Sequence, residues 1–161
     1  MPGVQVLPVG QAPMIVIDEI EGDFQVTGWD RPELQVRGVK ADEVSRRGNS
    51  DEIHLSASRN CSLQTPLQTS LRVGQVQGNA AINLLLGAVV VEDVDGNFAA
   101  NSTGPLTLGK MDGNISVRSV AGGLTTQDID GNARIAQIAG DLHLGNVDGN
   151  LVISEVVGNV Q

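Results

Sequence analysis

Aromatic residues and long apolar segments are both scarce in this chain of 161 residues. Phe and Trp together make up 2% of the sequence, and Tyr is absent. This composition argues against a wide core built around aromatic rings and favours narrow coils filled by aliphatic side chains. No segment approaches the roughly 20 consecutive apolar residues of a membrane-spanning helix, so direct insertion into a membrane is not expected.

Cysteine and basic residues are also few. Cys61 is the single cysteine, which excludes an intramolecular disulfide framework and favours a reducing compartment. The first 13 residues lack the basic start and unbroken apolar stretch of a signal peptide. We therefore expect a cytoplasmic location, with the cell envelope or the extracellular space as the alternative if the chain is a mature fragment. With 19 acidic and 10 basic residues, the net charge is −9, so nucleic acid and anionic membrane surfaces are not expected partners.

Glycine, in contrast, recurs at nearly constant intervals in the second half of the chain. The step is nine residues throughout, except for one of eight between Gly96 and Gly104. After most of these glycines the second, fourth and seventh residues are apolar, as in Ile115, Val117 and Val120. The spacing of two indicates a strand rather than a helix, and each glycine provides a corner between strands.

Every second repeat carries the motif Asp-Gly-Asn, at intervals of 17, 18 and 18 residues. Two nonapeptides therefore form one coil, and equivalent residues stack above one another. We predict an all-β fold, namely a right-handed, two-sided parallel β-solenoid with about 18 residues per coil. The predicted organisation is an extended Pro-containing tail (1–13), irregular N-terminal coils that cap the column (14–73) and a regular solenoid (74–161). The eight-residue step predicts that Ser102 lies at an inward position and that the column kinks there.

The order of these motifs resembles the bacterial putative-adhesin β-solenoid domain family. The similarity covers about residues 14–161 and includes the turn Gly28-Trp29-Asp30, the segment from Pro66 to Val73 and the repeated Val-Asp-Gly-Asn units. That family has no assigned function and is associated with envelope stress and cell surfaces. The resemblance implies a right-handed β-solenoid with no catalytic residues to transfer and with a scaffold or interaction role. A looser similarity to bactofilin-type cytoskeletal solenoids implies self-assembly.

The Asp-Gly-Asn motifs place two columns of polar side chains along one corner. The aspartates would stack about one strand spacing apart, and a bound cation would relieve their mutual repulsion. The repeats lack the glycine-rich calcium signature, however, and an Asp before a turn glycine usually bonds to nearby backbone N–H groups. We therefore expect no metal and no cofactor, with a cation-binding solenoid as a minor alternative. The candidates for that alternative are Asp95, Asp112, Asp130 and Asp148, and the predicted amide column is Asn97, Asn114, Asn132 and Asn150.

Catalysis is not expected. His143 shares an outward face with Asp141, but no third ligand or nucleophile stands at the stack-related positions, and His54 lies in the other half of the chain. Corners of two or three residues leave no wall for a cleft. The sequence therefore predicts a protein that is not an enzyme.

Two function classes remain. In the first, the chain is a structural or protein-interaction module of adhesin-like type, whose flat side offers small residues to a protein partner. In the second, it is a self-assembling scaffold that stacks end to end into oligomers or filaments. The outward row of the first hypothesis is Ala81, Ala99, Ser116, Arg134 and Val152, and the assembly edge of the second is Leu151, Ile153, Val156 and Val160.

Overall fold

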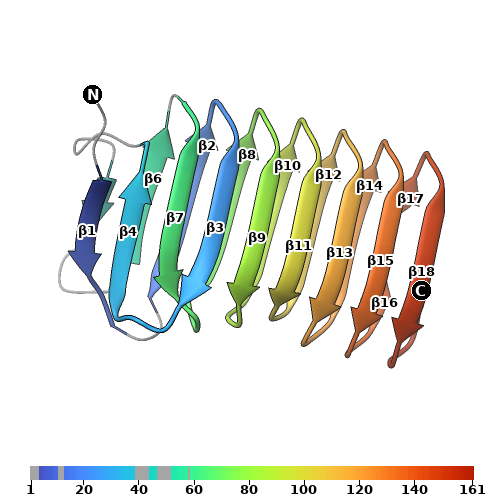
Figure 1. Cartoon of the computed structure of the whole chain (residues 1–161). Coiled ribbons are helices and arrows are strands. Elements are labelled where there is room, and N and C mark those ends of the chain that lie inside the picture. Colours follow the sequence, from blue (N-terminus) through green and yellow to red (C-terminus); the bar gives the residue numbers. More distant parts are fainter. Residues whose placement is uncertain (1–3, 11–12, 39–43, 47–51, 58) are drawn as a thin grey trace.

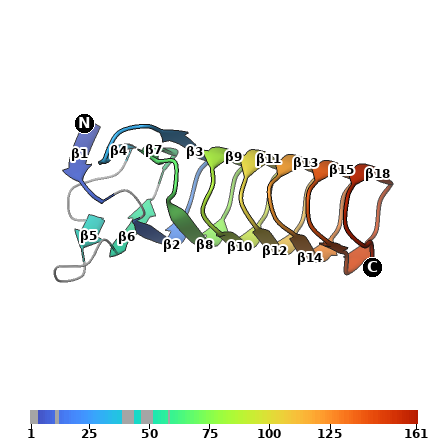
Figure 2. The ribbon, with the colours of Figure 1, turned by 90° about the horizontal axis from the view of Figure 1, so that it is seen from below.

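The chain forms two β-sheets that lie face to face. A computed structural model describes residues 4–10, 13–38, 44–46, 52–57 and 59–161. Within these residues all regular structure is β-strand. Figure 1 shows the strands side by side in a long row, and Figure 2 shows the two sheets as separate layers joined by short corners. The predicted all-β class is confirmed.

Within the described residues each sheet contains nine strands. The first, called sheet A, has the spatial order β1 (Val4–Pro8), β4 (Glu33–Arg37), β7 (Cys61–Pro66), β3 (Phe24–Trp29), β9 (Ala80–Leu85), β11 (Phe98–Thr103), β13 (Ile115–Val120), β15 (Ala133–Ile138) and β18 (Leu151–Val156). The second, called sheet B, has the order β16 (Leu142–His143), β14 (Leu124–Ile129), β12 (Leu106–Met111), β10 (Val89–Val94), β8 (Ser70–Val76), β2 (Met14–Ile20), β6 (Glu52–Ala57) and β5 (Val44–Arg46), and β17 (Asn146–Val147) also pairs with β14.

From β8 to β15 successive strands alternate between the sheets, β16 and β17 together take the next place in sheet B, and each strand pairs in parallel with the one a full coil away. Phe98 of β11, for example, is in register with Ala80 of β9 and with Ile115 of β13. These steps of 18 and 17 residues match the spacing of the Asp-Gly-Asn motifs. One strand of each sheet and the corners between them form one coil, so the arrangement is solenoid-like.

The first coil in the sequence does not lie at the end of the stack. Strand β2 lies between β6 and β8 in sheet B, and β3 lies between β7 and β9 in sheet A. Residues 14–29 are therefore enclosed by a coil that comes later in the chain. The sequence pattern does not reveal this exchange of order, because each coil carries the same apolar spacing.

Strands that break the parallel pattern cover the N-terminal end. Strand β4 pairs antiparallel with β7, β1 pairs antiparallel with β4, and β5 pairs antiparallel with β6. Within the predicted tail, Val4 to Pro8 is thus a strand of sheet A, and Val9 is buried. Departures from regular pairing at a sheet end protect backbone groups that would otherwise recruit another strand.

The core lies between the sheets and consists mainly of aliphatic side chains, with Phe24 and Phe98 among the largest fully buried residues. Each regular strand buries its first, third and sixth residues, as β13 does with Ile115, Val117 and Val120. Full burial of one such side chain contributes about 1.5–3 kcal/mol. Thr126 also occupies an inward position and is 3% exposed.

A simple alternation would bury residues one, three and five, so each strand contains one extra residue. In sheet A this residue is the fifth, which is skipped in the pairing register. The five residues at this position in the regular coils have φ between 56° and 61°, and they form a column of left-handed residues: Leu84, Ser102, Ser119, Gln137 and Glu155. A left-handed conformation costs an L-amino acid about 1–2 kcal/mol.

The shortened repeat does not produce the predicted kink. Thr103, which is 1% exposed, takes the inward position and stays in register with Leu85 and Val120, whereas Ser102 is a member of the left-handed column. The missing residue falls in the corner instead, because only Gly104 and Pro105 separate β11 from β12. The prediction that Ser102 points inward is wrong. The loss of one residue from a corner costs less free energy than its loss from a strand, because the strand must stay in register with its neighbours.

The left-handed column can be tested with a matched pair of leucines. Leu84 and Leu86 are 46% and 45% exposed, but only Leu84 has a positive φ. Both Leu→Gly changes lose the same side chain and add chain entropy to the unfolded state, and only Leu84→Gly also relieves strain. We expect Leu84→Gly to be more stable than Leu86→Gly by about 1–2 kcal/mol in urea unfolding. Equal losses would show that the column carries no strain.

Candidate functional site

A ladder of asparagine side chains runs along the corner that precedes the strands of sheet A. The amide oxygen of each Asn accepts a hydrogen bond from the backbone N–H of the Asn one coil further on. The four distances are 2.8–2.9 Å, for the acceptors Asn79, Asn97, Asn114 and Asn132 and the donors Asn97, Asn114, Asn132 and Asn150. The predicted amide column is confirmed, and each amide oxygen bonds to the backbone of the next coil.

The ladder continues into the irregular half of the chain, which sequence reasoning missed. The backbone N–H of Asn79 donates to Asp23 Oδ1 at 2.9 Å, and the N–H of Asp23 donates to Asn60 Oδ1 at 2.8 Å. The ladder therefore follows the spatial order of the coils across the exchange in chain order. A signal was present, because Gly22-Asp23-Phe24 has the same pattern as Gly96-Asn97-Phe98.

A shallow groove lies beside the ladder on the outer face of sheet A. Its central part has a volume of about 500 Å³, and adjoining hollows of about 420 and 410 Å³ share residues with it at either end. The floor of the central part is formed by small outward side chains of β9, β11 and β13, namely Ala81, Ala99 and Ser116. These are the first residues of the outward row identified from the sequence, and the row continues at Arg134 and Val152.

The central groove is nearly uncharged. Apart from Asp23, its polar lining consists of amides and a hydroxyl, from Gln25, Ser116 and the ladder asparagines. Because each ladder oxygen accepts a bond from the next coil, the Asn NH₂ groups are the parts that can reach a ligand. This arrangement can hydrogen-bond a neutral or weakly polar surface that approaches the backbone closely.

The candidate cation ligands lie in the same corner and are exposed: Asp95, Asp112, Asp130 and Asp148. The backbone N–H of each bonds to a carbonyl of the previous coil, as in the 2.9 Å bond from Asp95 N–H to Val76 O. Within the described residues, no group of three or more His, Cys, Asp or Glu side chains is arranged to hold a metal ion. The cation-binding alternative remains a prediction.

Asp93 is the acid with a shifted pKa in this region. It lies on β10, in register with Gln75 of β8 and Lys110 of β12. Burial raises the pKa of Asp93, and the charges of Asp95 and Asp112 raise it further, while Lys110 lowers it. One carboxylate oxygen of Asp93 is buried without a hydrogen-bond partner in the described part of the chain.

The two histidines lie at opposite ends of sheet B, on β6 and β16. His54 Nε2 is 3.6 Å from Glu52 Oε2, and His143 is exposed. Asp141 Oδ1 accepts a hydrogen bond from the backbone N–H of Asn159 at 2.9 Å, so this side chain links the corners of two successive coils. The structure therefore brings neither histidine into a shared site with the other.

The predicted assembly edge forms the last coil described. Leu151 is 40% exposed and Val160 is 53% exposed, while Ile153 and Val156 pack partly against the core. Equivalent residues one coil earlier are completely covered, as shown by Ile135 at 0%. The last coil has lower burial because it contacts a neighbouring coil on one side only.

The effect of Asp93 on stability has a definite sign. Because the pKa is higher in the folded state than in the unfolded chain, the folded state gains stability as the pH falls through that pKa. At neutral pH the carboxylate is destabilising, so Asp93→Asn should raise the Tm at pH 7, and the gain should shrink towards about pH 4. Thermal melts across this range measure it, with the exposed turn variant Asp148→Asn as control. A lower Tm at pH 7 would contradict the assignment.

Several solved structures are distantly similar to the chain, while no protein-family model and no curated protein sequence matches it. One is a "putative cell adhesion protein" from Clostridium sporogenes, at 8% identity and a TM-score of 0.34, over 99% of this chain and 98% of that chain. Another is a "putative lipid binding protein" from Parabacteroides distasonis, at 10% identity and a TM-score of 0.27, over 99% of this chain and 96% of that chain. At these TM-scores neither structure supports an argument about function.

Proposed function

We propose that this chain is a non-enzymatic interaction module that binds a protein partner through the groove on sheet A. The observation that supports it is the continuous groove beside the asparagine ladder, whose floor of small side chains lets a partner approach the sheet closely. Free Asn NH₂ groups along its rim offer repeated hydrogen bonds. The repeat provides a rigid surface, since each inner coil is held by two neighbours.

The remaining parts of the proposal follow from the sequence. The coils wind in the right-handed sense of nearly all parallel crossovers. The chain is a relative of the bacterial putative-adhesin β-solenoid domains, which is supported by the glycine and aliphatic motifs. The net charge of −9 argues against nucleic acid as a partner. A cytoplasmic location is proposed, and a location in the cell envelope or outside the cell is the alternative. Within the described residues, no helix is long and apolar enough to span a membrane.

Filling the groove tests the interaction proposal. Ala99 and Thr107 are both exposed, on sheet A and sheet B respectively, so Arg substitutions at either site should leave the fold intact. Immobilised wild-type protein and Thr107→Arg should capture the same proteins from an extract of the source organism, and Ala99→Arg should lose them by about tenfold or more. If the three capture profiles are identical, or if none differs from the bare matrix, the groove is not an interaction site.

Self-association is the second candidate, and a series of hydrogen bonds favours it. In sheet B the backbone N–H at the same position of each coil donates a hydrogen bond to a carbonyl of the next coil, as in Leu124 N–H to Asp141 O and Leu142 N–H to Asn159 O. Val160 follows Leu142 in register. The carbonyl of Asn159 and the N–H of Gln161, on either side of Val160, make the hydrogen bonds to Leu142. Successive backbone groups of a strand point to opposite sides, so the N–H of Val160 is directed away from Leu142, towards the position of a further coil. In a chain that stops at this coil, a second copy could receive this bond.

Val160→Pro removes this outward N–H and should leave the bonds of Asn159 and Gln161 in place. We expect it to weaken end-to-end association at least about tenfold, because a proline cannot donate to an added strand. Val160→Ala retains the N–H and is the matched control. Analytical ultracentrifugation at tens of micromolar measures the effect. A wild-type chain that is monomeric at this concentration would remove the self-assembly candidate and leave the groove proposal untouched.

A further inference from the structure

A second cavity lies where two chain connections pass each other, outside the groove. Strands β3 and β7 are adjacent and parallel, so both end at the same corner. From there residues 30–32 lead past β7 to β4, while residues 67–69 lead past the coil of β2 and β3 to β8. Figure 1 shows the first connection as the blue loop at the lower end of β3 and β4.

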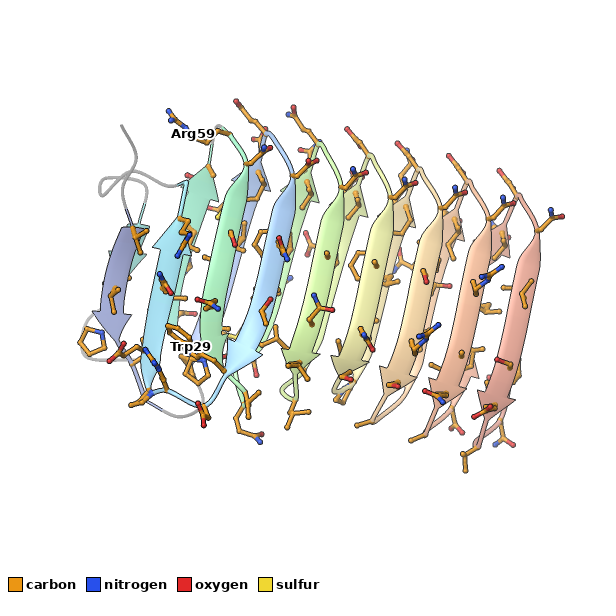
Figure 3. All side chains as sticks on the ribbon, in the orientation of Figure 1. Trp29 and Arg59 are labelled. Atoms are coloured by element: carbon orange, nitrogen blue, oxygen red, sulfur yellow. The ribbon has the colours of Figure 1, made fainter. Side chains whose placement is uncertain are left out.

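Connections that pass each other at one edge of a sheet are uncommon in folded proteins. Departures from such rules tend to mark functional sites. This corner is also where the single Trp of the chain lies, as Figure 3 shows for Trp29. The two connections enclose a pocket of about 240 Å³, lined by Trp29, Asp30, Arg31, Pro32, Pro66, Leu67 and Gln68.

Fixed contacts hold both walls of the crossover pocket. The indole N–H of Trp29 donates to the backbone oxygen of Glu33 at 2.8 Å. On the other wall, the buried hydroxyls of Thr65 and Thr69 are hydrogen-bonded at 2.8 Å, and Thr69 N–H donates to Pro66 O at 3.1 Å. Gly28 sits directly against the carbonyl of Leu84, where a side chain has no room. The pocket is thus preformed, which reduces the cost of binding.

The lining combines an apolar wall with three polar side chains. Trp29, Pro66 and Leu67 are buried or half-buried, whereas Asp30, Arg31 and Gln68 are exposed at the rim. The guanidinium carbon of Arg31 lies 5.2 Å from the ring centroid of Trp29 and covers one face of the indole. Asp30 provides an acceptor, Arg31 and Gln68 provide donors, and the two charges balance each other.

These properties select a ligand with a flat apolar face and hydroxyl groups around its edge. An aliphatic or aromatic side chain would fill the wall but leave the three rim groups unused. The volume is below the roughly 300–1,000 Å³ of pockets that enclose drug-sized molecules, so one ring fits. We propose that the crossover pocket binds a single sugar ring of a neutral glycan, with the ring against Trp29 and its hydroxyls bonded to Asp30, Arg31 and Gln68.

The test uses Trp29 as its reporter, because no other Trp or Tyr contributes to the emission of the chain. The whole chain is titrated with maltohexaose, cellohexaose and chitohexaose. We expect a saturable change in tryptophan emission with at least one of them, at a dissociation constant of about 1 mM or below. Gln68→Ala and Asp30→Asn should weaken binding about tenfold each, because the first removes a rim hydrogen bond and the second replaces a charged acceptor with a weaker neutral one.

Two controls distinguish this pocket from other surfaces. Gln127→Ala removes a glutamine of β14 that is also exposed and should leave the affinity unchanged. The groove variant Ala99→Arg should also bind as the wild type does, so failure of the groove proposal would not affect this result. Calorimetry of Trp29→Phe, whose melting is checked first, should show binding that is weaker but present, because the smaller ring retains an apolar wall.

Three outcomes would overturn the proposal. The first is the absence of a saturable change with all three oligosaccharides up to about 10 mM, a concentration at which a site with a 1 mM dissociation constant is nearly filled. The second is binding that Gln68→Ala and Asp30→Asn do not weaken, since the sugar would then lie elsewhere. The third is a response to N-acetyl-leucinamide and to none of the sugars, which would identify the pocket as a receptor for an apolar side chain.

Discussion

The parallel register between successive coils is the constraint on which the rest of the structure depends. Equivalent residues lie one strand spacing apart, so any feature of one repeat becomes a column along the molecule. Inward aliphatic residues become the continuous core, and the asparagine after each corner glycine becomes a hydrogen-bonded ladder. The outward Ala99 and Ser116 become part of a groove floor for the same reason. Function in such a fold resides in columns rather than in a cluster of loops.

The same register imposes costs, and these lie in columns as well. In the regular strands of sheet A, bringing the sixth residue inward requires an extra residue at position five, which adopts a left-handed conformation although none of the five residues is Gly or Asn. Like charges are also brought together, because Asp112 of the next coil raises the pKa of Asp93 in addition to Asp95 of the same coil. The repeat that is one residue shorter loses this residue from the corner at Gly104 and Pro105, while the strands keep their register.

The N-terminal half departs from the regular order of coils, and this departure forms the crossover pocket. Because the coil of β2 and β3 is enclosed by a later coil, two connections must pass at one corner, and the single Trp lies there. The Asn60–Asp23–Asn79 part of the ladder follows the spatial order across this exchange. The molecule thus presents two different surfaces, a long neutral groove over the repeats and a compact mixed pocket at the crossover.

The sequence alone determined the strand periodicity, the coil length, most of the inward residues and the amide column, because each is a local pattern that recurs from repeat to repeat. It also located the outward row that forms the groove floor. Only the tertiary structure decided the order of the first coils, the place of Thr103 and the partners of Asp23 and Asn60. Apolar alternation shows which face of a strand is buried but not which strand lies next to it. The crossover pocket is decided at this level, because its two walls are 36 residues apart, measured from Asp30 to Pro66, and only the exchanged coil order brings them together.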